Sequence, residues 1–146
     1  GYSSAASDVY KRQLIGQGDH VIAQYPSYQQ LYDWPKTLGA QVDYWHIKEE
    51  NNWLPQIEEL RRLVKSNTKL ICLNNAAQPT GAIMSPKFLS EVVEIARSVD
   101  AYILCDEVYL PLDEETPYSP IADLYEKGIS TNSNSLFFST CIVPVK

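Results

Sequence analysis

The stretch from residue 69 to residue 107, KLICLNNAAQPTGAIMSPKFLSEVVEIARSVDAYILCDE, decides the fold class. It opens with a continuous apolar run over residues 69–73, which is typical of a strand buried on both faces of a parallel sheet. Ser85 and Pro86 then give the N-cap and first-turn signals of an amphipathic helix. A second apolar run over residues 101–105 completes a strand–helix–strand unit, and such a crossover joins parallel strands.

The same alternation of strand and helix patterns extends toward the N-terminus. Apolar residues 20–24 predict a strand, and the aromatic-rich residues 28–38 predict a helix that Gly39 is placed to end. Residues 41–45 alternate polar and apolar side chains like a half-buried strand, and Pro55 suits the first turn of another helix. We therefore predict an α/β fold, in which helices cover both faces of a mostly parallel sheet.

Charge and hydropathy exclude several classes of partner. The 146 residues include 12 basic and 18 acidic side chains, so the formal net charge is −6. An acidic chain of this kind is a poor ligand for nucleic acid or anionic lipid. Neither a 20-residue apolar run nor a signal peptide is recognisable, so we expect no membrane partner, no nucleic acid partner and a cytoplasmic location.

Three cysteines, Cys72, Cys105 and Cys141, are widely spaced along the chain. Their odd number and spacing suggest neither a disulfide framework nor a zinc cluster. We predict buried free thiols and no metal site.

Residues 1–13, GYSSAASDVYKRQ, show neither a helical nor a strand period. The segment resembles a translated sequencing adapter, although a flexible natural terminus is the alternative. We therefore expect residues 1–13 to be foreign to the fold and residues 14–146 to form part of one domain.

Two loops that follow predicted strands carry the functional signal. Ligands of parallel α/β sheets bind beyond the carboxyl ends of the strands. The amide-rich stretch NNAAQPTG over residues 74–81 has side chains that could serve a ligand, and Asp106-Glu107 follows the next apolar run. Acids here also suit a helix N-terminus, or the Mg²⁺ site of a P-loop nucleotide hydrolase. The hydrolase needs a phosphate loop, GxxxxGK[ST], which residues 14–146 lack and upstream sequence would have to supply.

Five segments occur in an order that resembles the large domain of class I/II aminotransferases, the pyridoxal-phosphate (PLP) enzymes of fold type I. They are GDHVI (18–22), YPSY (25–28), NNAAQPTG (74–81), ILCDEVY (103–109) and ISTNSNS (129–135). The sequence around YPSY is also similar to the sequences of the capreomycidine-synthase-like subgroup. The resemblance implies an incomplete fold type I large domain, PLP as cofactor, amino acid and 2-oxo acid substrates, and a homodimeric parent protein.

The resemblance also assigns cofactor-binding roles to five residues. Asp106 matches the acid that pairs with the protonated pyridine nitrogen, and Tyr109 matches the phenol that hydrogen-bonds the ring oxygen. Tyr28 matches the aromatic residue that stacks on the ring, and Ser133 matches a hydroxyl that holds the phosphate. Gln78 stands where the family has asparagine, so its longer amide is expected to displace the bond to the ring oxygen.

The family's Schiff-base lysine normally follows the Ser-x-Ser of residues 133–135, where this chain has Leu136. Leucine has no amine, so the resemblance implies a chain without covalent cofactor attachment or its general base. We predict an inactive chain with no catalytic residue. Residues 136–146, LFFSTCIVPVK, depart from the family altogether, which fits a shifted reading frame. The alternative function is a non-catalytic binding module that retains the fold.

Overall fold

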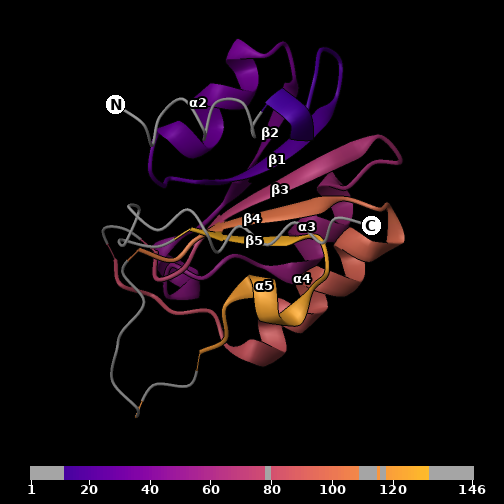
Figure 1. The fold of residues 1–146 in the computed structure, drawn as a ribbon. Helices are drawn as coiled ribbons and strands as arrows, with labels where there is room; N and C mark the ends of the chain where they lie inside the picture. The colour runs from indigo at the N-terminus through magenta and orange to yellow at the C-terminus, as the bar shows by residue number, and fades with distance from the viewer. Residues whose placement is uncertain (1–11, 78–79, 109–114, 116–117, 132–146) are drawn as a thin grey trace.

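The computed structural model describes residues 12–77, 80–108, 115 and 118–131. Five strands form one sheet in the order β2-β1-β3-β4-β5, and every neighbouring pair is parallel (Figure 1). The strands are β1 (His20–Tyr25), β2 (Gln41–His46), β3 (Thr68–Asn74), β4 (Tyr102–Asp106) and β5 (Gly128–Thr131). The predicted parallel α/β sheet is confirmed.

Helices cover both faces of this sheet, as predicted. The first core cluster joins α3, α4 and α5 to one face, and the second joins α2 to the other (Figure 1). The helices are α2 (Gln30–Thr37), α3 (Ile57–Leu63), α4 (Pro86–Ser98) and α5 (Ile121–Leu124), and a single 3₁₀ turn, η1, covers Glu49–Asn51. No helix among the described residues is long and apolar enough to cross a membrane.

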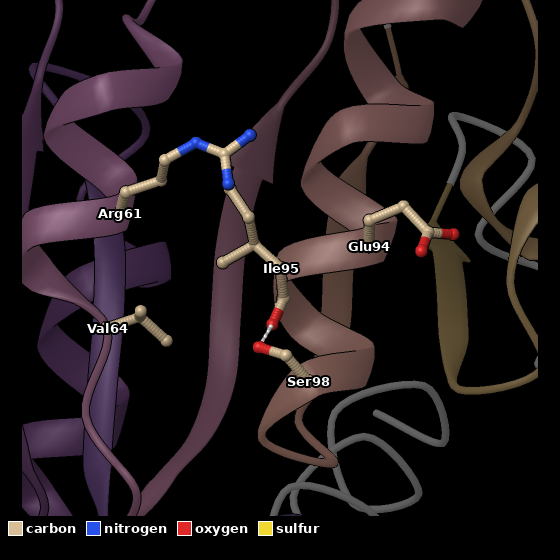
Figure 2. A pocket seen from close by; sticks show the side chains of 5 residues that line it. All are labelled: Arg61, Val64, Glu94, Ile95 and Ser98. Atoms are coloured by element: carbon tan, nitrogen blue, oxygen red, sulfur yellow. Dashed lines mark hydrogen bonds between the residues drawn. The ribbon is translucent and has the colours of Figure 1, made fainter.

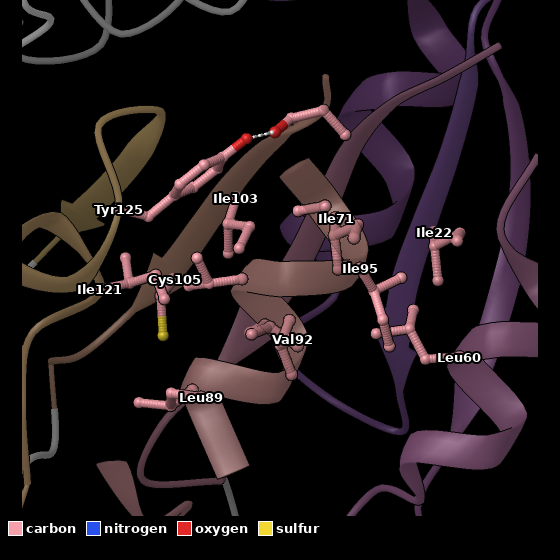
Figure 3. Packing of buried hydrophobic residues seen from close by; sticks show 14 of the residues in the cluster. Ile22, Leu60, Ile71, Leu89, Val92, Ile95, Ile103, Cys105, Ile121 and Tyr125 are labelled. Carbon is pink, nitrogen blue, oxygen red and sulfur yellow. Dashed lines mark hydrogen bonds between the residues drawn. The ribbon is translucent and has the colours of Figure 1, made fainter. Parts of the chain in front are cut away.

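Helix α4 forms where its capping signal predicts it. The Ser85 hydroxyl accepts a hydrogen bond from the backbone N–H of Phe88 at 3.1 Å, and Pro86 occupies the first turn. The buried face of the helix is Leu89, Val92, Val93, Ile95 and Ala96. These side chains pack on the sheet residues Ile71 and Ile103 (Figure 3). In the same core the Tyr125 hydroxyl donates to the carbonyl of Ala101 at 2.7 Å.

Successive side chains along a strand point to opposite faces of the sheet, so residues of the strands are divided between the two hydrophobic cores. Cys72 faces the α2 side of the sheet, whereas Cys105 faces the side covered by α4 and α5. Both are buried and neither forms a disulfide among the described residues, so the predicted buried thiols are confirmed for these two, while Cys141 lies outside the described residues. Gly39 ends α2 with φ +83°, the left-handed conformation that glycine adopts without strain.

Two elements near the C-terminus were not assigned from the sequence. Helix α5 and strand β5 lie between residues 118 and 131 and pack directly against each other. Residues 1–11, which belong to the segment predicted to be foreign, lie outside the described residues, so that prediction stays open.

Candidate functional site

The carboxyl ends of the strands gather the predicted site residues at one edge of the sheet. Tyr25, Asn74 and Asp106 are the last residues of β1, β3 and β4, and Asn74 is the direct register partner of Asp106. Because β3 lies between β1 and β4, the ends of these two strands are about 10 Å apart. A flat heterocycle can span that distance.

Asp106 is a half-buried carboxylate at this edge. Its Oδ1 accepts a hydrogen bond from the backbone N–H of Val108 at 3.1 Å, and burial raises the pKa of the carboxyl above its ordinary value. Among the described residues no cationic side chain forms an ion pair with it. A partly desolvated acid without a cation is the chemistry that suits a cationic ligand.

The amide-rich loop is tied to Asp106 through the backbone. The carbonyl of Asp106 accepts from the N–H of Asn75 at 2.8 Å and from Nδ2 of Asn74 at 3.2 Å. The side chain of Asn75 is buried and pairs twice with the backbone of Met84, accepting at 2.9 Å and donating at 3.4 Å. The amide of Asn75 therefore shapes the loop, and the expectation that amides of residues 74–81 serve a ligand stays a prediction.

Tyr28 lies in the loop that follows β1, and its side chain is 53% exposed. The turn before it is fixed by the Ser27 hydroxyl, which donates to the carbonyl of Gln24 at 2.7 Å. Tyr25, by contrast, packs against other aromatic rings, with its centroid 4.8 Å from that of Tyr44. Tyr28 is thus the tyrosine of the YPSY segment whose ring is more open to a ligand.

The structure places two of the five predicted cofactor-binding residues, Asp106 and Tyr28, at the same edge. The other three, Tyr109, Gln78 and Ser133, lie outside the described residues. Leu136, where the lysine was expected, also lies outside them. Among the described residues no group of three or more His, Cys, Asp or Glu side chains is placed to hold a metal ion.

Two buried polar side chains lie near this edge: Gln24, which the sequence analysis missed, and Glu107, which it named without a role in the site. Gln24 lies in β1, where its Oε1 accepts from the N–H of Asn74 at 3.0 Å, while its buried Nε2 has no hydrogen-bond partner among the described residues. Glu107 follows Asp106 and accepts from the N–H of Ile121 at 2.7 Å. A glutamine inside the apolar run HVIAQ was the one available signal for Gln24.

A pocket of about 310 Å³ lies elsewhere, between α3 and α4 (Figure 2). Its lining residues are Arg61, Val64, Glu94, Ile95 and Ser98. They belong to the C-terminal parts of α3 and α4 and to the residue that follows α3. Because these helices run antiparallel to the strands, their C-terminal ends lie at the opposite edge of the sheet from Asp106. Glu94 points away from α3 in Figure 2, and the Ser98 hydroxyl donates to the carbonyl of Ile95 at 2.6 Å. The polar groups of this pocket do not converge on a ligand position.

Comparison with known proteins identifies related chains. The family profile described as Aminotransferase class I and II matches residues 2–133. Glutamate-pyruvate aminotransferase AlaA of Haemophilus influenzae is 37% identical over 97 residues, which cover 66% of this chain and 24% of that protein. An aspartate aminotransferase of Pyrococcus horikoshii is 31% identical over 128 residues, covering 86% of this chain and 33% of that protein.

Two further similarities bear on the expected subgroup and on the expected cofactor. Capreomycidine synthase of Streptomyces vinaceus is 27% identical over 105 residues, covering 72% of this chain and 26% of that protein. The crystal structure of a PLP-dependent aminotransferase from Streptococcus suis superposes with a TM-score of 0.84 at 52% identity, covering 94% of this chain and 36% of that one. The chain spans about a quarter to a third of the length of these curated relatives.

Proposed function

The chain belongs to the class I and II aminotransferase family, and from that premise we propose that it is part of a PLP-dependent aminotransferase that acts on an amino acid. The resemblance found in the sequence is confirmed at the level of family and fold. The P-loop hydrolase alternative is not retained, because the family match spans residues 2–133. The capreomycidine synthase match is the weakest in identity of the three curated relatives described, so we propose no subgroup.

The observation that carries the proposal is the state of Asp106. It ends a central strand, is half-buried, has a pKa raised by burial and lacks a cation among the described residues. When bound, PLP supplies an electron-withdrawing ring that stabilises negative charge on the substrate. Asp106 would hold the proton on the ring nitrogen, because a carboxylate beside that nitrogen favours its charged form.

The remaining binding roles are proposed for residues on the surrounding loops. The exposed ring of Tyr28 would stack on the heterocycle, which orients a flat ligand. Tyr109 and Gln78 would hydrogen-bond the ring oxygen, and the hydroxyl of Ser133 would hold the phosphate.

We propose further that the chain binds PLP without attaching it covalently and does not catalyse the reaction. Leu136 has no amine with which to attach the cofactor or carry a proton. This makes a non-catalytic binding module the second candidate function. For the full-length protein we propose amino acid and 2-oxo acid substrates and a homodimer. A cytoplasmic location is supported by Cys72 and Cys105, which are buried and form no disulfide among the described residues.

The test of the main proposal is PLP binding by the full-length protein and by two variants, Asp106→Asn and Glu94→Gln. Both variants remove one negative charge, but Glu94 lies on an exposed surface of α4. We expect Asp106→Asn to weaken binding strongly, measured as cofactor absorbance retained after dialysis, and Glu94→Gln to bind like the parent. Equal retention by both variants would refute the role of Asp106.

The proposal that PLP is not covalently attached has a separate test in the 146-residue chain. After incubation with PLP and reduction with borohydride, we expect no adduct at residue 136. The variant Leu136→Lys restores an amine at that position and is expected to gain an adduct, detected by mass spectrometry. A PLP adduct at residue 136 in the unaltered chain is chemically excluded, so an adduct on another lysine would identify a different attachment site and contradict the proposed noncovalent binding.

A further inference from the structure

Glu107 is a buried carboxylate that contacts three elements near the proposed site. Glu107 is only 6% exposed. Its side chain lies on the sheet face opposite that of Asp106, because the side chains of successive residues in extended backbone point to alternate faces. Oε1 accepts from the N–H of Ile121, the first residue of α5, at 2.7 Å. The side chains of Ser130 of β5 and Cys105 of β4 lie close enough to lower the pKa of this carboxyl against the effect of burial.

The elements that Glu107 joins are in close contact. The hydroxyl of Ser130 accepts from the N–H of Ala122 at 3.1 Å, so its own hydrogen is free to point at Glu107. A Cβ on Gly128 would lie 2.5 Å from the carbonyl oxygen of Ile121, which shows how closely the first residue of α5 approaches β5. The backbone N–H of Glu107 donates to the carbonyl of Thr131 at 2.7 Å. Side chain and backbone of Glu107 therefore hold the α5–β5 unit at the end of β4.

This arrangement lies next to Asp106, at the proposed cofactor site. Glu107 is adjacent to Asp106, and β5 ends at Thr131, two residues before Ser133. We propose that Glu107 is a positioning residue, which fixes the end of β5 relative to Asp106 and so sets the spacing between Asp106 and Thr131 at this edge of the site. The inference rests on the proposed function, because only a bound PLP would use that spacing.

A carboxylate suits this position better than an amide. The N–H of Ile121 donates to the Glu107 side chain, the Ser130 hydroxyl and Cys105 thiol lie nearby as further donors, and an ionised carboxylate has acceptor positions for all of them. A glutamine would keep one acceptor oxygen for Ile121 and turn an NH₂ group toward the remaining donors. Removal of the side chain would leave the N–H of Ile121 buried without an acceptor, which is costly.

The experiment compares PLP binding by the full-length protein with that of Glu107→Ala, Glu107→Gln and Ser85→Ala. The Ser85 variant loses the cap of α4 and serves as a control for destabilisation away from the site. We expect Glu107→Ala to raise the dissociation constant of PLP about tenfold or more and to change the visible circular dichroism of the bound cofactor. Glu107→Gln is expected to recover part of the affinity, and Ser85→Ala to bind within about twofold of the parent.

The outcomes separate this inference from the proposed function. A Glu107→Ala protein that is less stable but binds PLP with unchanged affinity and dichroism would reduce Glu107 to a structural role and overturn the inference. If Glu107→Ala does not fold, Glu107→Gln decides: unchanged affinity and dichroism overturn the inference, and weaker binding supports it. A parent protein that does not bind PLP, or binds it independently of Asp106, would overturn the proposed function itself.

Discussion

Replacement of Gly128 by alanine tests the packing of α5 against β5 directly. The new Cβ would lie 2.5 Å from the carbonyl oxygen of Ile121, 2.9 Å from its carbonyl carbon and 3.0 Å from the carbonyl oxygen of Tyr125. Non-bonded carbon atoms normally lie about 3.5–4.0 Å apart. Because all three neighbours are backbone atoms, no side-chain rotation relieves the overlap, and α5 or β5 has to move.

The magnitude follows from two opposing effects. Overpacking of a well-packed site costs about 1–3 kcal/mol. Alanine also restricts the unfolded chain, which returns about 0.4–1 kcal/mol where the native backbone tolerates a side chain. We expect Gly128→Ala to lower the free energy of unfolding by about 1–2 kcal/mol, which lowers the urea midpoint by about 0.5–1 M.

Urea unfolding followed by far-ultraviolet circular dichroism measures this change in the 146-residue chain. The matched control is Gly16→Ala, because a Cβ on Gly16 meets nothing within 4 Å and Gly16 does not adopt the left-handed conformation. We expect the control to keep or slightly raise the midpoint. A Gly128→Ala midpoint equal to that of the control would refute the close approach of Ile121 to β5, and with it the support for the contact between Glu107 and Ile121.

Three further predictions concern stability. Ser85→Ala removes the α4 cap and is expected to lower the free energy of unfolding by about 1 kcal/mol, measured by urea titration. Burial raises the pKa of Glu107 above the ordinary 4.5, so its charged form destabilises the fold as the pH rises through the folded pKa. Glu107→Gln should lack this pH-dependent loss, measured as the change in urea midpoint of each protein from pH 4.5 upward. The hydrogen bond with His20 lowers the pKa of Asp43 below 3.8, so Asp43→Asn should remove a stabilisation present above that pH and lost in acid. Parallel acid titrations of parent and Asn variant test this.

The sequence predicted the strands because burial leaves a strong local pattern. The apolar run of residues 69–73 lies within β3, Thr68–Asn74, and the helix signal at Ser85 and Pro86 marks the start of α4. Strand β5 and helix α5 have four residues each, which is too short for a reliable period. Their positions depend on contacts between residues distant in sequence, such as that of Glu107 with Ile121.

The position of the candidate site in the fold was predictable from the sequence, but the contacts of its individual side chains were less so. Asp106 was placed correctly at a strand end, because parallel strands present their carboxyl ends at one edge. The sequence does not determine where an amide side chain points, so it could not show that the amide of Asn75, within the stretch expected to serve a ligand, pairs with the backbone of Met84. Glu107 was expected to suit a local helix N-terminus. It does accept from the first residue of a helix, α5, which begins 14 residues later.

The two edges of the sheet differ in how well their polar groups are satisfied. At the amino edge the buried His20 pairs through both ring nitrogens, with Thr68 at 2.7 Å and with Asp43 at 2.8 Å. At the carboxyl edge Gln24 keeps a buried Nε2 without a partner, and Asp106 keeps a half-buried carboxylate without a cation among the described residues. A buried donor without a partner, such as Nε2 of Gln24, costs about 1–3 kcal/mol, so it persists where something other than stability selects it. The concentration of these two groups at the edge where parallel α/β sheets bind ligands is therefore independent physical support for placing the cofactor site there.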